Sequence, residues 1–156
     1  MTTNRIGLST EKSEELANLL SDFLANYSVF YQNVRGYHWN IKGEKFFELH
    51  VKFEELYNDL FLKIDEVAER VLTLGYAPNH QFTAYLKTSE IKETTEVSNG
   101  IKSVEEILNS FKVLLQKQRV ILDVSGEIND EGTNAHNERL HTRAREVSLD
   151  VLCLFE

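Results

Sequence analysis

Apolar residues recur at steps of three and four along the first part of the chain, over about 30 residues that begin near Ser9. This spacing puts them on one face of a long α-helix. The face consists of Leu16, Leu19, Leu20, Phe23, Leu24, Tyr27, Phe30, Val34, Tyr37 and Ile41. Gly43 interrupts the pattern, so we expect a tight turn there before the next helix.

Two further segments show the same helical spacing. One runs from Phe46 to Val71 and stops at Gly75, and the other runs from Ile101 to Leu122 and reaches about Ser125. Between them, residues 75–97 lose the periodicity apart from a short aromatic piece around Phe82, Tyr85 and Leu86. A fourth segment follows the break at 129–133. The pattern predicts an all-α four-helix bundle with one long crossover that carries a short extra helix.

Composition supports this fold class and limits the function. A chain of 156 residues predicts a single domain over residues 1–156, and one Pro and seven Gly are too few for an all-β protein with frequent turns. We expect residues 1–8 to be a flexible N-terminus. No apolar run is long enough for a membrane span, and the start of the chain does not resemble a signal peptide. The single cysteine, Cys153, excludes an internal disulfide and a thiolate metal cluster. A cytoplasmic protein is therefore predicted.

The charge balance argues against nucleic acid as a main partner. The chain carries 25 acidic residues against 17 Lys and Arg, for a formal net charge of −8. The first 20 residues offer only Arg5 and Lys12 against Glu11, Glu14 and Glu15. Because DNA binding without sequence preference depends on a surplus of basic groups, DNA binding is expected to be weak or absent.

Histidines and carboxylates share one edge of the second predicted helix. His50, Glu54, Asp65 and Glu69 lie at roughly 0°, 40°, 60° and 100° around the helix axis, at about 100° per residue. His38, near the end of the first helix, faces inward with the apolar residues beside it. Nitrogen and oxygen ligands without sulfur suit Fe(II), Mn(II) or Zn(II).

Spacing along the helix divides these residues into two half-sites. Glu54 and Asp65 are roughly 16 Å apart at about 1.5 Å per residue, which is too far for one metal ion. If this helix packs antiparallel against its copy about a two-fold axis, His50 and Glu54 of one chain meet Asp65 and Glu69 of the other, twice. The spacing therefore predicts an intersubunit metal site to which His38 also contributes.

A plainer interpretation of the same residues stays open. Asp65, Glu66 and Glu69 could form a solvated face paired with Lys63 and Arg70. His38 and His50 could be hydrogen-bonded core histidines.

Several motifs together resemble the Dps family, the mini-ferritins named as DNA-binding proteins from starved cells. They are YHWNIKG at 37–43, FFELH at 46–50, KFEELY at 52–57, IDEVAER at 64–70 and LG at 74–75. The resemblance covers roughly residues 9 to 135. It implies a ferritin-like bundle that assembles into a hollow dodecamer, oxidises Fe(II), preferably with hydrogen peroxide, and stores the ferric mineral.

The resemblance also implies roles for particular residues. The ferroxidase ligands carry over to His38, His50, Glu54, Asp65 and Glu69, which would hold two irons per intersubunit site, with Zn or Mn as possible substitutes. Glu54 departs from the Asp common at its position, which would lengthen one ligand arm and alter affinity at one iron position. Trp39 is a candidate for taking up oxidising equivalents, and Glu55 is a candidate for mineral nucleation. The candidates for acidic iron-entry pores are Asp123, Glu127 and Asp130.

The C-terminal residues 136–156 depart from the family and from the apolar pattern expected of a fourth helix. Leu140, Val147, Leu152 and Leu154 only partly mimic that pattern. Codons compatible with this stretch, read one nucleotide over, can spell HIMNDYIREQEKLVWMFCAYL, which has amphipathic spacing. Our hypothesis is that this tail is a frameshifted reading.

Three functions follow, in order of preference. The first is an iron-oxidising storage cage that protects the cell from oxidative damage. The second is a non-specific DNA-binding nucleoid protein with a secondary iron site, and the third is a structural bundle whose two-fold edge merely holds zinc or salt bridges.

Overall fold

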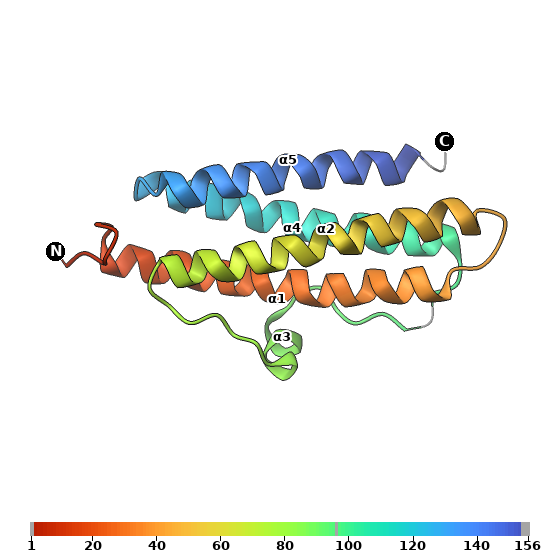
Figure 1. Cartoon of the computed structure of the whole chain (residues 1–156), viewed down its shortest axis with the longest axis horizontal. Coiled ribbons are helices and arrows are strands. Elements are labelled where there is room, and N and C mark those ends of the chain that lie inside the picture. The colour runs from red at the N-terminus through yellow and green to blue at the C-terminus, as the bar shows by residue number, and fades with distance from the viewer. Residues whose placement is uncertain (1, 96, 154–156) are drawn as a thin grey trace.

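Five α-helices make up the described part of the chain. The computed structural model describes residues 2–95 and 97–153, and its helices are α1 (Thr10–Asn40), α2 (Phe46–Thr73), α3 (Phe82–Thr88), α4 (Gly100–Glu127) and α5 (Glu131–Cys153). The described residues contain no β-strand, only an isolated bridge between Thr3 and Ser9. Four long helices lie side by side, and the short α3 lies outside them on the crossover between α2 and α4, in contact with α1 (Figure 1). The predicted fold class is confirmed.

The two glycines predicted to interrupt the helical pattern lie in turns, one between α1 and α2 and the other after α2. α1 stops two residues before the turn that contains Gly43, whose φ is 107°, and the turn after α2 contains Gly75 at φ 97°. Both glycines adopt left-handed backbone, a conformation that costs side-chain-bearing residues free energy. The short turn makes α1 and α2 antiparallel neighbours.

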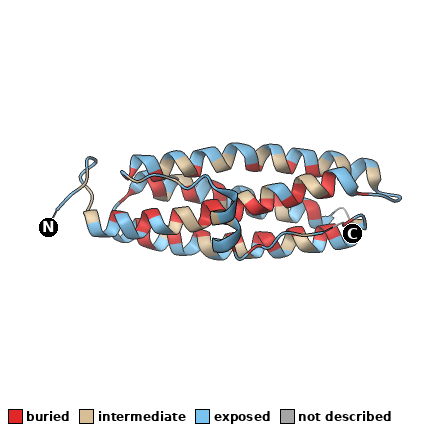
Figure 2. Ribbon diagram, turned by 90° about the horizontal axis from the view of Figure 1, so that it is seen from below, coloured by how far each residue is buried: buried red, intermediate tan, exposed pale blue. Residues whose placement is uncertain are grey.

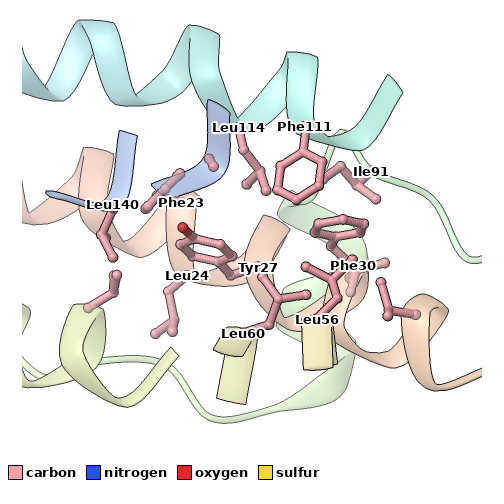
Figure 3. Packing of buried hydrophobic residues seen from close by; sticks show 14 of the residues in the cluster. Phe23, Leu24, Tyr27, Phe30, Leu56, Leu60, Ile91, Phe111, Leu114 and Leu140 are labelled. Carbon is pink, nitrogen blue, oxygen red and sulfur yellow. The ribbon is translucent and has the colours of Figure 1, made fainter. Parts of the chain in front are cut away.

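The inward faces of the four long helices form one apolar core. Figure 2 shows buried residues along these faces, and Figure 3 shows aromatic rings at the centre. Phe30 of α1 meets Phe111 of α4 edge to face, with ring centroids 5.2 Å apart. Tyr27 and Phe23 pack in the same way at 4.5 Å. The largest fully buried side chains are Tyr27, Tyr37, Phe23, Phe30, Phe53, Leu16, Leu24, Leu49, Leu60, Leu74, Ile107 and Leu114.

Two buried asparagines of α1 fix the crossover against the bundle. Asn26 Oδ1 accepts hydrogen bonds from the hydroxyl of Ser89 and the backbone N–H groups of Glu90 and Ile91, at 3.0–3.2 Å. Asn33, seven residues later, donates to Lys92 O and accepts from Thr94 N. These contacts satisfy backbone groups of a loop that has no secondary structure of its own. Sequence reasoning missed both residues.

The C-terminal tail is helical as far as Cys153, although its sequence only partly shows the apolar pattern of a fourth helix. Its buried apolar residues are Leu140, Ala144, Val147 and Val151, at steps of four, three and four. Leu152 is exposed, and Leu154 lies outside the described residues. Ala144 and Val151 complete a narrow apolar face that the larger residues alone do not show.

Several polar side-chain atoms are nevertheless buried without a hydrogen-bond partner where α5 meets the rest of the bundle. Among the described residues, the buried side-chain atoms without a hydrogen-bond partner belong to Gln118, Asp130, His136, Asn137 and His141. All of them lie on α5 or on the parts of α4 and the turn that meet it. Such atoms destabilise a fold because their desolvation is uncompensated. This clustering supports the proposal that the tail is a frameshifted reading.

The described N-terminal residues form a hydrogen-bonded turn before α1. Asn4 Oδ1 accepts from the backbone N–H groups of Ile6 and Leu8, and Asn4 Nδ2 donates to Ser13 Oγ. Flexibility of residues 1–8 stays a prediction. None of the helices in the described part of the chain combines the length and the apolar character needed to cross a membrane.

Candidate metal centre

Two histidines meet at the closed end of the α1–α2 hairpin. His38 lies in the last turn of α1 and is 8% exposed, whereas His50 lies in the second turn of α2 and is half-buried. Their rings stack with centroids 3.7 Å apart and planes 18° apart. His38 Nδ1 is 2.7 Å from His50 O, and His50 Nδ1 is 2.9 Å from His38 O. Each ring is therefore held by the backbone of the other residue.

This reciprocal pairing decides which nitrogen of each ring can bind a metal. A backbone carbonyl only accepts hydrogen bonds, so each Nδ1 must carry a proton. In the neutral imidazole, Nε2 then has the free lone pair that a metal requires. An imidazole whose other nitrogen donates to a carbonyl is the usual arrangement of a metal-binding histidine. Both histidines are hydrogen-bonded, as the plainer interpretation expected, but the bonds leave Nε2 of each ring available.

Aromatic rings enclose the stacked pair. Phe46 stacks on His50 at 4.8 Å, and Tyr57 meets His38 edge-on at 5.3 Å. These rings limit rotation of the imidazoles by packing. Sequence reasoning missed Tyr57, although its position seven residues after His50 put it on the same face of α2.

The three predicted carboxylates point into solvent and have no partner in the described structure. Glu54, Asp65 and Glu69 are exposed, and their carboxylates form neither an ion pair nor a hydrogen bond with any described residue. The basic partners that the plainer interpretation assigned to this face are engaged elsewhere. Lys63 pairs with Asp59 at 2.8 Å and Arg70 pairs with Asp130 at 2.7 Å. Salt bridges therefore do not explain this acidic edge, the side of α2 that carries Glu54, Asp65 and Glu69.

A single chain does not complete a metal site. Within residues 2–95 and 97–153, no three His, Cys, Asp or Glu side chains are placed to hold one ion. The structure brings His38 and His50 together at one end of α2, while Asp65 and Glu69 lie farther along the same helix. This arrangement agrees with two half-sites per chain and leaves their joining to a second copy.

Beside the acidic edge lies a large open groove. It has a volume of about 1180 Å³ and is lined by α1, α2 and the crossover, with Asp65, Trp39 and Phe61 in its wall. Phe61, Leu62 and Phe82 are 60%, 61% and 82% exposed. An apolar surface of this kind typically marks a contact with another protein chain.

The other candidate residues occupy varied environments. Trp39 is 57% exposed and stacks under the guanidinium of Arg35, 4.9 Å away, without a ring contact to either imidazole. Glu55 pairs with Lys52 at 3.4 Å. Asp123 and Glu127 are exposed on the last turns of α4.

Asp130 has a structural role instead of a surface position. It is 4% exposed, and its Oδ1 accepts from Arg70 Nη2 at 2.7 Å and from the backbone N–H of Thr133 at 3.2 Å. It thus caps the start of α5 and ties it to α2. These contacts argue against Asp130 as a cation-attracting pore residue, so the pore prediction now depends on Asp123 and Glu127.

Comparison with known proteins identifies the family. A ferritin-like domain model matches residues 17–142. The DNA protection during starvation protein of Porphyromonas gingivalis is 42% identical over 127 residues, 81% of this chain and 80% of that protein. A Dps crystal structure from Vibrio cholerae O1 superimposes with a TM-score of 0.97 and 49% identity, covering 100% of this chain and 98% of that one. A Dps structure from Bacillus brevis gives 0.90 and 33%, covering 96% and 100%.

The chain belongs to the Dps family. The resemblance predicted from the motifs is thereby confirmed, and the matched segment of this Dps chain contains all five predicted ligands. The Vibrio cholerae protein is described as a member of a broad superfamily of ferritin-like diiron-carboxylate proteins. The matched segment ends inside α5.

Proposed function

We propose that this chain is the subunit of an iron-oxidising storage cage. The observation that carries the proposal is the pair of imidazoles with both Nε2 atoms available, one of which lies on the same helix as three carboxylates that have no described partner. The diiron-carboxylate description of the Vibrio cholerae relative supports the choice of iron. Zinc and manganese accept the same ligands and are expected to compete.

Iron is the substrate in this proposal. The carboxylates of Glu54, Asp65 and Glu69 attract Fe(II), and the two imidazoles fix its position. Hydrogen peroxide takes one electron from each of two Fe(II) ions and, with two protons, forms two water molecules. The protein would thereby consume peroxide and free iron together and protect the cytoplasm from oxidative damage.

The proposed site lies between two chains. An antiparallel α2 pair about a two-fold axis joins His38, His50 and Glu54 of one chain to Asp65 and Glu69 of its partner, twice. The exposed apolar groove beside Asp65 supplies a surface for this contact. A closed dodecamer with Glu55 near the mineral and Asp123 and Glu127 at the entry pores completes the proposal.

Complementation tests the sharing of ligands between chains. One variant carries His50→Ala with Glu54→Ala, and the other carries Asp65→Ala with Glu69→Ala. Each alone should not oxidise Fe(II) with peroxide. When they are co-expressed, half of the dimers are mixed and one of the two sites in each is intact, so about a quarter of the wild-type activity should return. A mixture that assembles but stays inactive would overturn the intersubunit site.

Sedimentation velocity tests the cage itself. Fe(II) and peroxide are added in small alternating portions, and the boundary is followed at a protein and at a ferric wavelength. We expect a dodecamer-sized boundary that gains ferric absorbance and mass. A monomer or dimer with separately precipitated iron would refute storage by this chain.

DNA binding is the second candidate, since the Porphyromonas gingivalis relative is named for DNA protection. The net charge of −8 opposes it. A gel shift at rising salt tests it, and we expect little retention at low salt and none at physiological salt.

A further inference from the structure

The chain contains a single Asn-Gly pair, Asn99 and Gly100, at the start of α4. In such a pair the backbone nitrogen of the glycine can attack the Asn Cγ and close a cyclic succinimide with loss of ammonia. Glycine favours this reaction because it has no side chain to hinder the attack. Asn99 is exposed, so water reaches its amide. The proposed iron chemistry uses neither residue.

Hydrogen bonds hold the folded Asn99 away from this reaction. Its Oδ1 accepts from Lys102 N at 3.0 Å and thereby caps α4. Its backbone O accepts from Ser103 N at 3.0 Å and from Ser103 Oγ at 2.9 Å. Ser103 is fully buried, so both of its bonds are shielded from water.

The backbone conformation of Asn99 also opposes ring closure. Its ψ of 125° is extended, which points Gly100 N away from Asn99 Cγ. Bringing the two atoms together requires rotation about the Cα–C bond into a sparsely populated region of ψ. The same rotation turns the Asn99 carbonyl away from Ser103. The first turn of α4 must therefore open before the ring can close.

We propose that Asn99 is a deamidation site, protected while the first turn of α4 is closed and modified when that turn opens. Gly100 N loses its proton to water and bonds to Asn99 Cγ, while the Cγ–Nδ2 bond breaks and Nδ2 takes up a proton and leaves as ammonia. Water then opens the succinimide at either of its two carbonyls. The chain gains one negative charge, and the reaction needs no oxidant, metal or enzyme.

The two products of ring opening have opposite effects on α4. Aspartate keeps an oxygen that can accept from Lys102 N, and its negative charge lies at the positive end of the helix. Isoaspartate adds a methylene to the main chain, and the carbonyl that accepted from Ser103 becomes a carboxylate outside the main chain. Formation of isoaspartate therefore makes a transient opening of the first turn permanent.

The modification would also affect the closed end of the α1–α2 hairpin. Ser98 O, one residue before Asn99, accepts from Lys42 N at 3.0 Å. Lys42 directly follows Ile41, the C-cap residue of α1. Isoaspartate at the next residue should displace Ser98 and weaken this bond. We therefore expect amide exchange at Lys42 to accelerate in the modified chain.

Peptide mapping by mass spectrometry tests the protection of Asn99. The full chain is incubated at mildly alkaline pH, folded in buffer or unfolded in urea, and isoaspartate is detected by enzymatic methylation. Conversion at Asn99 should be at least about tenfold slower in the folded chain, because three hydrogen bonds must break first. Equal rates, or no conversion in urea, would overturn the proposal.

Two variants test the role of the first turn in the folded chain. Lys102→Pro removes the N–H that caps Asn99 and places proline in the first turn, where a helix tolerates it. Conversion should rise about fivefold, the usual effect of losing a side-chain cap. Lys102→Ala keeps this N–H and should match wild type.

Ser103→Ala is the second variant, and it removes only the bond from Ser103 Oγ to Asn99 O. It should also accelerate conversion, by less than the loss of the cap. A rate that rises in neither Lys102→Pro nor Ser103→Ala would overturn control by the first turn, and a rise in either one supports it.

Discussion

At the residue scale, Gly132 is the position where a single methyl group has a defined consequence. A Cβ there would lie 2.7 Å from Arg70 Nη2. Arg70 cannot easily move, because its Nε donates to Thr133 at 2.6 Å and its Nη2 to Asp130 at 2.7 Å. Gly132→Ala should therefore break this largely buried pair and lower the free energy of unfolding by about 1–3 kcal/mol.

The matched control is Gly126→Ala in α4. Its Cβ would meet only Asn134 Nδ2, at 3.8 Å, so it should be neutral or stabilise by about 0.5–1 kcal/mol. Chemical denaturation of both variants measures the difference. Equal stabilities would contradict the close contact at Arg70.

Glu54 offers a second test at this scale. Its arm is one methylene longer than that of the Asp common in the family, and its carboxylate has no partner in the described structure. Glu54→Asp should shift Fe(II) affinity at one of the two iron positions, by roughly tenfold, and leave the other unchanged. Anaerobic calorimetry with Fe(II) measures both positions, and Glu55→Asp, at a carboxylate paired with Lys52, is the control.

The sequence singled out the candidate ligand residues but not their local geometry. His38, His50 and the acidic edge followed from helical periodicity alone. The tautomer of each imidazole depends on a backbone carbonyl twelve residues away. The burial and pairing of Asp130 were not foreseen for the same reason, since its partner Arg70 is 60 residues distant. Contacts between elements are not encoded in spacing along one element.

At the scale of elements, Asn26 is one of the two α1 side chains that hold the crossover. Asn26 accepts three hydrogen bonds from 89–91 with a single buried oxygen. Asn26→Ala should lower the free energy of unfolding by about 2–3 kcal/mol, because it leaves buried donors unsatisfied. Amide exchange should accelerate locally at Glu90 and Ile91. Asn40→Ala, which removes one exposed bond to Gly36 O, should change neither.

The attachment of α5 should weaken in acid. Burial lowers the pKa of His136, helped by Arg139, Arg70 and Lys63 and opposed by Glu66. Burial also lowers the pKa of His141, with Arg119 and Arg145 acting in the same direction. Both imidazoles are thus favoured as neutral in the folded state. Above the ordinary pKa of 6.5 both histidines are neutral in the folded and the unfolded state, so they do not destabilise the fold. As the pH drops from 6.5 toward the lowered folded-state pKa values, the unfolded state binds protons first and the free energy of unfolding falls.

Denaturation at pH 7.5 and pH 5.5 measures this effect. The double variant His136→Gln with His141→Gln should lose less stability between the two values than wild type. His80→Gln, at an exposed histidine of the crossover, should behave as wild type. An identical loss in all three proteins would contradict the assignment.

At the scale of the whole molecule, the tail forms the fourth long helix of the bundle. The buried polar atoms without described partners are concentrated where α5 meets the bundle. If the tail is a frameshifted reading, the natural protein carries an amphipathic helix there and should be more stable. Intact mass of the protein expressed from its native gene distinguishes the two sequences. A mass that matches the present sequence would exclude an error of reading.

The imidazole pair has a mechanical consequence apart from metal binding. Each ring bonds to the backbone of the residue twelve positions away, so the two bonds close a short loop of chain much as a cross-link does. The two bonds therefore add to the apolar packing, such as Tyr37 against Phe53, that holds α1 against α2 near the turn. Replacement of the exposed Glu44 should be tolerated while both histidines remain, whereas a side chain at Gly43, with φ 107°, should be strained. The geometry proposed to receive an ion is fixed before any ion arrives.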